Sequence, residues 1–406
     1  MVFAHLADVH IGAWRDPVMK ELPIKAFEEA VSVILARKLD FVLIAGDLFN
    51  TAVPPLDMVK RTVTQLQRLK ESSIPIYAIA GSHDYSPTGK TMLDVLEEAG
   101  LLVNVMKGEV VEEDGKGRLR LRFTQDPKTG IKMTGILGRA GQLDKHYYKD
   151  LDRGPLEKEP GKKIFLFHAP IAELKPKELA QMDASPVSMM PKGFDYYAGG
   201  HVHIVEDVSL PGYAKVVYPG PVFPASFSEL EDLGRGGFVI VNEDYEIERV
   251  PIAVQETINL RIDAEKRSVE EVNLSLKELE NTDVAGKIVL LRAEGELAEG
   301  RVTDVRFKEL IRAFMEKGAY AVMKNTARLS SKEFEEFQVA QSSAEELEER
   351  LIREHVGQQP IGLTAEEEAK LTGELFAILG EEQSEGEKKY EYEERVVKAA
   401  KARLER

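Results

Sequence analysis

Five short apolar runs punctuate the first 200 residues, with longer amphipathic segments between them. The runs are Val2–Ala7, Phe41–Ala45, Ile76–Ala80, Ile164–Phe167 and Tyr196–Ala198. Each run predicts a buried strand, because apolar residues occupy both its odd and its even positions and would line both faces of a sheet. Between the runs, residues 24–38 and 56–71 carry apolar side chains at helical spacing. Strand, helix and strand in this order predict βαβ units, and hence an α/β fold with parallel strands.

Every one of these runs ends in residues that can bind a metal ion. They are Asp8-Val9-His10, Gly46-Asp47, Gly81-Ser82-His83-Asp84, His168 and Gly200-His201-Val202-His203. A strand that carries a carboxylate or an imidazole at its carboxyl end places it on the edge of an α/β sheet, where ligands bind. We therefore expect these five strand ends to build one site.

Each motif on its own also has a structural explanation. Asp8 could end a strand in an Asx turn, Asp47 could belong to a turn, and Ser82 could cap a helix. His168 alone would more often be a hydrogen-bonded core histidine. The two histidines of Gly200–His203 are a stronger signal, because residues i and i+2 of an extended chain point the same way. Five such strand ends together favour a metal site over the separate explanations.

The donor types also predict the kind of metal. Carboxylates mixed with imidazoles suit manganese, iron or zinc better than calcium. The chain has no cysteine, which excludes a disulfide scaffold and a thiolate metal site. Asp47 is well placed to bridge two ions.

The net charge of −16 argues at first against a nucleic-acid enzyme, because phosphate contacts usually require a basic surface. Much of this charge lies in the tail, where residues 331–406 hold 20 Asp and Glu against 11 Lys and Arg. A catalytic body that draws positive charge from metal ions can still bind DNA. The chain shows neither a signal-peptide pattern nor an apolar stretch of membrane-spanning length, so we expect a cytoplasmic protein without a membrane partner.

The order of the motifs, DxH, GD, G(N/S)HD, H and GHxH, resembles that of the calcineurin-like binuclear metallophosphoesterases. Longer segments resemble the SbcD and meiotic-recombination-eleven nucleases of DNA repair, and this resemblance covers Met1 to about Val250. The segments are LADVHIG, IAGDLFN, IAGSHDYSPTGKTMLD, GGHVH and VYPGPVFPASFSE. The resemblance implies a metallophosphoesterase β-sandwich flanked by helices, with a small α+β capping domain and a C-terminal helical tail.

Carried over by position, the resemblance also assigns metal ligands. It implies two Mn²⁺ ions, with iron, zinc or magnesium as alternatives. The first ion would be held by Asp8, His10, Asp47 and His203, and the second by Asp47, Ser82, His168 and His201. The family usually has asparagine at the position of Ser82. Many relatives have histidine at the position of Asn50, where it is linked to the handling of single-stranded or endonucleolytic substrates.

The ligand set implies phosphoester hydrolysis. Two cations about 3.5 to 4 Å apart lower the pKa of a water held between them, so that hydroxide attacks phosphorus. His83 would stabilise or protonate the leaving oxygen. Asp84 has two candidate roles, which are to orient His83 or to brace the turn.

The expected nuclease domain comprises residues 1–254. The chain after it divides into three parts. Residues 255–330, the expected capping domain, predict strands at 258–262, 288–291 and 319–322 and helices at 269–281 and 305–317. Residues 331–342 form a linker to a helical segment, residues 343–406. Capping boxes at Ser343–Glu346 and Thr364–Glu367 open two helices there, and a third begins near Tyr390.

Each tail helix is too short to be stable alone, so its apolar face must pack on another surface. That surface could be the capping domain of the same chain. The resemblance instead implies an SMC-like ABC ATPase, and an acidic amphipathic tail suits a protein partner better than DNA. It also implies a homodimer through helices 56–71 and 90–99, whose candidate contacts are Met58, Val63, Met92, Leu93 and Leu96.

Three functions are compatible with the sequence. The first is a metal-dependent DNA nuclease, a 3′ to 5′ double-strand exonuclease and single-strand endonuclease in double-strand-break repair. The second is another metallophosphoesterase, acting on phosphoproteins, cyclic nucleotides or nucleotide esters. The third is a non-catalytic scaffold. We favour the first, because a single-domain phosphatase has no evident need for a capping domain and a helical tail, and a scaffold should have lost its ligands.

Overall fold

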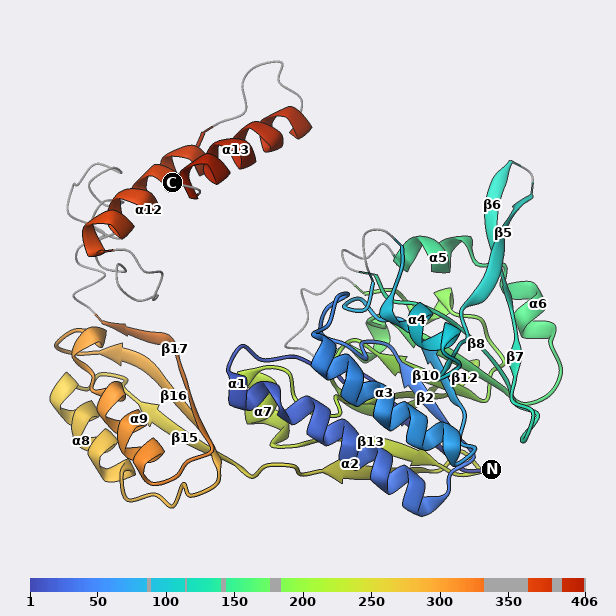
Figure 1. Ribbon diagram of the computed structural model, residues 1–406, viewed down its shortest axis with the longest axis horizontal. Coiled ribbons are helices and arrows are strands. Elements are labelled where there is room, and N and C mark those ends of the chain that lie inside the picture. Colours follow the sequence, from blue (N-terminus) through green and yellow to red (C-terminus); the bar gives the residue numbers. More distant parts are fainter. Residues whose placement is uncertain are drawn as a thin grey trace. The chain divides into compact units, whose positions relative to one another are not determined.

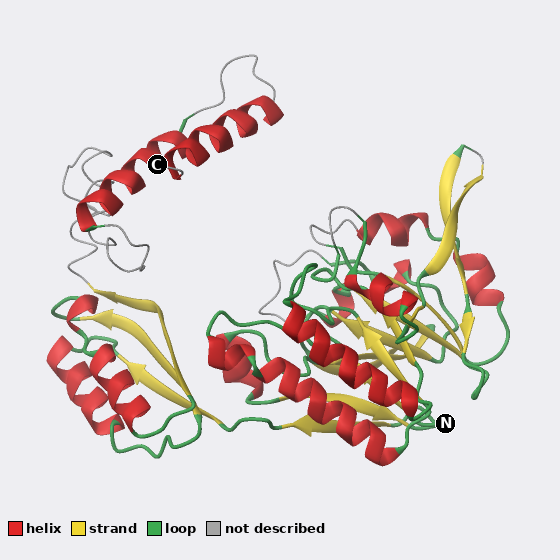
Figure 2. Ribbon diagram, in the orientation of Figure 1, coloured by secondary structure: helices red, strands yellow, loops and turns green. Residues whose placement is uncertain are grey.

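The chain forms two compact units in the computed structural model (Figure 1). The first contains residues 1–297 and 302–329, and the second contains residues 298–301 and 330–406. The structure describes residues 1–85, 89–113, 115–139, 144–175, 184–331, 364–381 and 389–404. Two six-stranded sheets dominate the first unit, and helices cover them (Figure 2).

The first sheet contains three of the five predicted strands. Its order is β14 (Ile247–Ile252), β13 (Gly236–Val241), β1 (Phe3–Leu6), β2 (Phe41–Ala45), β3 (Ile76–Ile79) and β4 (Val103–Asn104). Strands β1 to β4 are parallel, as predicted for the βαβ units. β13 and β14 extend the sheet in the antiparallel sense on the other side of β1, which the sequence pattern did not predict.

The second sheet contains the other two predicted strands. Its order is β11 (Val205–Leu210), β12 (Tyr213–Pro219), β10 (Tyr196–Gly200), β9 (Lys163–His168), β8 (Lys132–Ile136) and β7 (Thr124–Gln125). The four central strands are parallel, and the two edge strands are antiparallel to their neighbours. β9 and β10 therefore end on the same side of the sheet.

One of the cores lies between the two sheets. Alternation along the strands sends Phe3 and Phe41 to this inner core, where they meet Ile164 and Tyr196 of the second sheet. The intervening residues of the first sheet face the helices α2 (Leu22–Arg37), α3 (Leu56–Glu71) and α4 (Met92–Glu98). The outer face of the second sheet packs on α5 (Asp144–Asp150) and α6 (Arg153–Lys158). The predicted β-sandwich flanked by helices is confirmed.

The helices predicted at 24–38, 56–71 and 90–99 correspond to α2, α3 and α4. α4 begins after Thr91, whose side chain forms a capping box with Asp94. The short helix α1 (Pro17–Lys20) and the hairpin of β5 (Lys107–Glu113) and β6 (Lys116–Arg122) were not predicted. The hairpin extends away from the sandwich in Figure 1.

Residues 257–331 form a small three-stranded sheet with two helices, which we call the cap. The sheet has the order β15 (Thr257–Asp263), β16 (Ile288–Leu297) and β17 (Ala321–Ser331), and the helices are α8 (Val269–Leu279) and α9 (Phe307–Glu316). All five predicted elements are present. β17 is much longer than predicted, because Lys324-Asn325-Thr326 and Arg328 interrupt the apolar positions of the strand and leave no apolar run.

The cap packs against helix α7 (Phe227–Leu233) of the sandwich. Glu231 of α7 has a side chain only 4% exposed and pairs with Arg292, at 2.5 Å, and with Arg261, at 3.0 Å. The guanidinium of Arg292 also lies 5.3 Å from the ring centre of Phe227. Asn259 of β15 donates to the backbone oxygen of Glu231. One turn of α7 thus anchors the cap sheet.

The second unit contains helices α12 (Ala365–Leu379) and α13 (Lys389–Leu404). The predicted capping box at Thr364 is present, since Glu367 N–H donates to the Thr364 hydroxyl and Thr364 N–H donates to the Glu367 carboxylate. The two helices contact each other, and the Tyr392 hydroxyl donates to the backbone oxygen of Glu381. The capping box predicted at Ser343 lies outside the described residues. No described helix is both long enough and apolar enough to span a bilayer.

Candidate metal centre

The carboxyl ends of β1, β2 and β3 in one sheet meet those of β9 and β10 in the other. Backbone hydrogen bonds join the loops that follow β1 and β2. Asp8 N–H donates to Gly46 O over 3.2 Å, and His10 N–H donates to Asp47 O over 3.0 Å. The second sheet joins through His201, whose N–H donates to the Asp8 carboxylate over 2.9 Å. We call the six residues Asp8, His10, Asp47, His168, His201 and His203 the ligand rim. The structure brings all six together.

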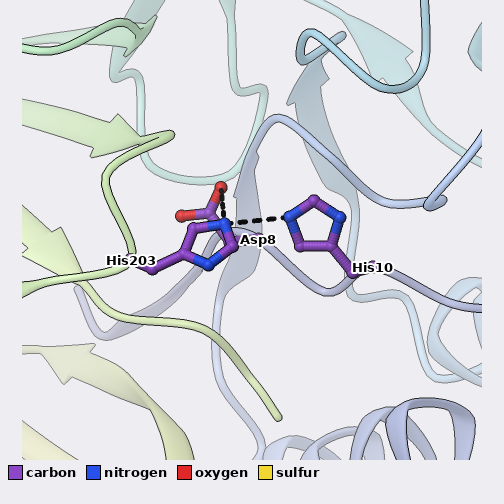
Figure 3. Close-up of side chains that lie close together, drawn as sticks. All are labelled: Asp8, His10 and His203. Atoms are coloured by element: carbon purple, nitrogen blue, oxygen red, sulfur yellow. Dashed lines mark hydrogen bonds and ion pairs between the residues drawn. The ribbon is translucent and has the colours of Figure 1, made fainter. Parts of the chain in front are cut away.

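Asp8, His10 and His203 form one cluster of ligand atoms, which lie within 4.8 Å of one another (Figure 3). The Nε2 atoms of His10 and His203 are 3.0 Å apart. Nε2 of His203 lies 3.7 Å from Oδ1 of Asp8. Three donors from two different sheets therefore converge on one point.

Asp47 connects this cluster to a second one. Its Oδ2 atom lies 3.1 Å from Nε2 of His168 and 3.6 Å from Nε2 of His10. Asp8, Asp47 and His168 form a group of ligand atoms within 4.8 Å of one another, and His10, Asp47 and His83 form another. One carboxylate thus faces both halves of the centre, as a bridging ligand must.

Ser82 and His201 lie at the margin of the group that contains Asp47 and His168. The Ser82 hydroxyl is 3.5 Å from Oδ2 of Asp47, the same oxygen that faces His168. The ring of His201 packs edge-on against that of His168, with their centres 5.0 Å apart. His201 belongs to none of the three ligand groups found among the described residues, and its firmest contact is through its backbone N–H.

The backbone of the ligand rim is strained. Five of its six residues have a left-handed φ, and these are Asp8 (51°), His10 (48°), Asp47 (52°), His201 (101°) and His203 (54°). Only five other non-glycine residues do so in the described parts of the chain. Such conformations cost roughly 1–3 kcal/mol each and are found where a function requires them.

Two histidines of the rim have fixed ring orientations. Nδ1–H of His168 donates to Ala45 O over 2.8 Å, which turns Nε2 toward Asp47. The ring fits tightly against Gly46, where a Cβ atom would lie 2.2 Å from Nδ1 and where φ is +91°. Nδ1–H of His203 donates to Oε2 of Glu229 over 2.9 Å. Metal-binding histidines are typically oriented in this way, by a carbonyl or a carboxylate on the remote nitrogen.

Glu229 is a functional residue that the sequence reasoning missed. It lies in α7, where its carboxylate also accepts from Ala225 N–H and from the Ser226 hydroxyl. Ser226 caps the same helix by accepting from Glu229 N–H. The Ser-x-x-Glu spacing of this cap is visible in the sequence and could have drawn attention to Glu229.

His83 and Asp84 have different environments. His83 is exposed, and its Nδ1–H donates to Asn50 O over 2.9 Å, while its backbone N–H donates to Oδ1 of Asp47. Asp84 is buried and accepts three backbone N–H groups, from Leu48, Phe49 and Gly81. These contacts favour the bracing role of Asp84, because the Asn50 carbonyl orients the His83 ring.

Charge in the rim is balanced by protons. Burial alone lowers the pKa of His168, but Asp47 and Asp8 raise it to about 10. Burial likewise lowers the pKa of His203, but Asp8 and Glu229 raise it to about 9. The same imidazolium of His168 holds the pKa of Asp47 well below its usual range, although burial opposes this. Burial lowers the pKa of His10 to about 3, so that His10 is neutral.

The donor set fits divalent cations. Against the effect of burial, Asp47 and Asp8 raise the pKa of His168, Asp8 and Glu229 raise that of His203, and a bound cation would replace the protons of these histidines. Imidazole nitrogens mixed with carboxylate oxygens suit manganese, iron and zinc. The arrangement can therefore hold two metal ions around Asp47.

Known proteins are similar to this chain. The family model of the calcineurin-like phosphoesterases matches residues 1–205, which include every predicted ligand. The DNA double-strand break repair protein Mre11 of Archaeoglobus fulgidus is 29% identical over 346 residues, covering 77% of this chain and 75% of that protein. The protein of the same name from Methanococcus maripaludis is 28% identical over 294 residues, covering 69% and 74%. A dimetal phosphatase structure from Danio rerio has a TM-score of 0.39 at 12% identity over 62% of this chain and 98% of its own, and adds nothing to the family assignment.

Proposed function

Because the chain belongs to the calcineurin-like phosphoesterase family, we propose that it is a metal-dependent DNA nuclease of double-strand-break repair. It would act as a 3′ to 5′ double-strand exonuclease and a single-strand endonuclease. The observation that carries this proposal is the pair of ligand clusters around Asp47. The similarity to the two archaeal repair proteins supports DNA as the substrate, because it extends beyond the residues that the phosphoesterase family shares.

The ligands are proposed for two Mn²⁺ ions. The first would be held by Asp8, His10, Asp47 and His203, and the second by Asp47, Ser82, His168 and His201. Convergence of Nε2 atoms from His10 and His203 supports the first set. The contacts of Asp47 with His168 and Ser82 support the second. Iron, zinc or magnesium would use the same donors.

Bound cations at this site would activate water and neutralise charge on the phosphate. The residues of the chain supply the remaining chemistry. Asp47 holds the backbone of His83 in place, and the Asn50 carbonyl takes up Nδ1–H of the His83 ring. In its doubly protonated form, His83 also carries a hydrogen on Nε2, which it would give to the leaving oxygen. The exposure of His83 supports this role, because the substrate must reach it.

The test compares two substrates in the presence of manganese, namely 3′-ended duplex DNA and bis(p-nitrophenyl) phosphate. We expect digestion of the DNA. Rapid turnover of the ester with intact DNA would instead favour a phosphoesterase of another specificity. Absence of bound metal in elemental analysis would favour a scaffold.

His83→Ala separates chemistry from metal binding. We expect the variant to keep its metal and to lose DNA cleavage, since proton transfer by a positioned side chain contributes typically 10²–10⁴-fold. His146→Ala is the matched control, because His146 is also exposed and lies on α5 outside the ligand groups. Loss of metal together with activity in His83→Ala would make His83 a ligand instead.

We also propose that the tail binds an SMC-like ABC ATPase. α12 and α13 pack on each other and still expose Leu379, Val397 and Leu404, which are 62%, 51% and 63% accessible. These apolar side chains support a protein partner. Deletion of residues 341–406 should abolish ATPase binding and spare cleavage by the isolated protein. Unchanged complex formation would refute this assignment.

A homodimer through α3 and α4 is proposed with a corrected set of contacts. Met58, Leu93 and Leu96 were candidate contacts, but they are buried in the core of their own chain, at 2%, 0% and 2% exposure. Val63 and Met92 are half-buried and stay candidate contacts. The helices also expose Leu56, at 83%, and Val95, at 60%. Leu56→Glu should therefore dissociate the dimer in sedimentation experiments.

The proposed location of the assembly is on DNA in the cytoplasm, at the nucleoid of a prokaryotic cell.

A further inference from the structure

Arg139 occupies an unusual position beside the ligand rim. Its guanidinium carbon lies 4.4 Å from the ring centre of Tyr85 and 6.0 Å from that of Tyr147. Nη1 of Arg139 donates to the Tyr147 hydroxyl over 3.3 Å. The guanidinium therefore packs on two aromatic side chains, which fix its plane.

The neighbouring residues place this guanidinium at the proposed active site. Gly138 packs against His168 so closely that a Cβ atom would lie 2.4 Å from the ring Cδ2. Gly138 N–H also donates to Ala80 O, at the end of β3. Tyr85 follows directly after the turn that carries Ser82, His83 and Asp84. Arg139 thus lies between the chain segments that bear His168 and His83.

No carboxylate neutralises Arg139 among the residues that the structure describes. Its Nε–H is buried and lacks a hydrogen-bond partner. Arg61 and Arg292, in contrast, each pair with glutamates, as expected in a chain of charge −16. A buried donor without a partner destabilises the fold. An anionic ligand would balance the charge of the guanidinium.

We propose that Arg139 binds a backbone phosphate of the substrate strand next to the one that is cleaved. This inference rests on the proposed nuclease function and adds a substrate contact to it. The ligand class is a phosphodiester, because the planar guanidinium has donors in a fork that matches two phosphate oxygens. The phosphate is a neighbouring one, since the guanidinium contacts Tyr85 and Tyr147 rather than the ligands themselves.

The test uses Arg139→Gln with short duplex DNA and manganese. We expect the KM for DNA to rise about 10-fold, with the salt dependence of binding reduced by about one phosphate contact. Hydrolysis of bis(p-nitrophenyl) phosphate, which has a single phosphate, should fall by a much smaller factor. Arg139→Lys should recover part of the affinity, because it keeps the charge and loses the fork.

A neutral methylphosphonate next to the cleaved linkage provides an independent check. It should weaken binding by the wild-type protein about 10-fold and have little further effect on Arg139→Gln. Arg249→Gln is the matched control, because Arg249 lies on the edge strand β14 and has no acidic partner among the described residues. Metal content and thermal unfolding of each variant show whether the fold is intact.

Three outcomes would overturn the inference. Arg139→Gln could match Arg249→Gln in both KM and salt dependence. The loss could be equal on DNA and on bis(p-nitrophenyl) phosphate, which would place Arg139 at the cleaved phosphate or the metal centre. Finally, the wild-type protein could hydrolyse the ester and leave DNA intact, which refutes the nuclease function itself and the inference with it.

Discussion

The sandwich that carries the ligand rim and the cap are built from similar elements, but the rim and the cap differ in what they bury. Sandwich and cap both place helices on a sheet that includes parallel strands. The rim buries Asp8, His10, Asp47 and His168, whereas residues 257–329 of the cap, all of them described, bury no ionisable side chain. In the same range of the cap, only Lys266 among non-glycine residues has a left-handed φ.

The difference shows which part of the sandwich lowers its stability. Buried charges and left-handed turns both oppose folding, so the rim can persist only because the surrounding structure holds it. The apolar core between the two sheets provides this support, since strands of both sheets end at the rim. The cap has no such cost and contributes its own apolar core. Sites of strain are therefore expected where the function lies.

The largest expected effect is a loss of hydrolysis, and it separates two aspartates that each lie at a strand end, one in the rim and one in the cap. Asp47→Asn should reduce manganese-dependent phosphodiester hydrolysis by more than about 100-fold, because the loss of a residue that merely orients a metal ligand already costs about 10–100-fold. Asp263→Asn makes the same change at the end of β15, where the carboxylate is exposed and accepts only from Glu265 N–H among its described contacts. It should leave hydrolysis unchanged.

Steady-state kinetics and elemental analysis check this comparison. Asp47→Asn should also bind less manganese per chain, since its carboxylate faces both clusters. Full activity of Asp47→Asn, or equal losses in both variants, would remove the distinction between the rim and the cap.

The next effect separates two glutamates of the single helix α7. Glu229→Gln should weaken manganese binding about 10–100-fold, because it disturbs the carboxylate that orients His203. Glu231→Gln should keep the metal affinity and lower the free energy of unfolding by about 2 kcal/mol, the scale of a hydrogen bond to a charged group. Manganese titration and urea unfolding measure the two quantities. Parallel losses in both variants would mean that the cap contact and the metal site are coupled through α7.

Sequence patterns predicted that the residues of the rim converge, because the signals for this are local. A short apolar run that ends in Asp8 or His168 predicts both a buried strand and a residue at its edge. The partner of His203 was missed, because Glu229 lies on a helix that reaches the site only through tertiary folding. Arg139 was missed for the same reason. Its neighbour Gly138 gives no chemical signal in the sequence, although it packs on His168.

Patterns of exposure were harder to predict. Helical spacing identified α3 and α4, with the bounds of α3 reproduced at Leu56–Glu71. It did not separate the residues that pack on the chain's own sheet from those that stay exposed. Met58 is buried, whereas Leu56, two positions earlier, lies on another side of the helix and is exposed. The antiparallel strands β13 and β14 were missed as well, since β13 joins β1 across more than 200 positions and β14 pairs with β13.

A smaller effect is expected from Ser82→Asn. The Ser82 hydroxyl lies 3.5 Å from Oδ2 of Asp47, and an asparagine oxygen would extend farther from the backbone. We expect the affinity for the second manganese ion to rise by a factor of up to about 10, which corresponds to about 1.4 kcal/mol. Isothermal titration calorimetry can resolve the two sites. A weaker second site in Ser82→Asn would show that the hydroxyl is adapted to this chain, whereas Ser275→Asn in the cap, on α8, should change neither site.

The smallest effect compares a histidine of the inner core with those of the rim. His5 lies between the sheets, with Nδ1 2.9 Å from the Tyr196 hydroxyl, and burial lowers its pKa to about 3. The folded protein then resists protonation that the unfolded chain accepts below a pKa of about 6.5, so the stabilising contribution is complete above pH 6.5 and is lost as the pH falls toward 3.

His5→Leu removes this dependence. Between pH 6 and pH 5 the wild-type protein, measured in EDTA, should lose about 1 kcal/mol of unfolding free energy more than the variant. His168 should act in the opposite sense, because Asp47 and Asp8 raise its pKa to about 10 against the effect of burial, so its contribution is lost as the pH rises through 10. Urea unfolding from about pH 5 to pH 10 measures both signs. An equal pH dependence of the wild type and His5→Leu would mean that His5 is protonated inside the fold, and that the inner core, like the rim, accommodates charge.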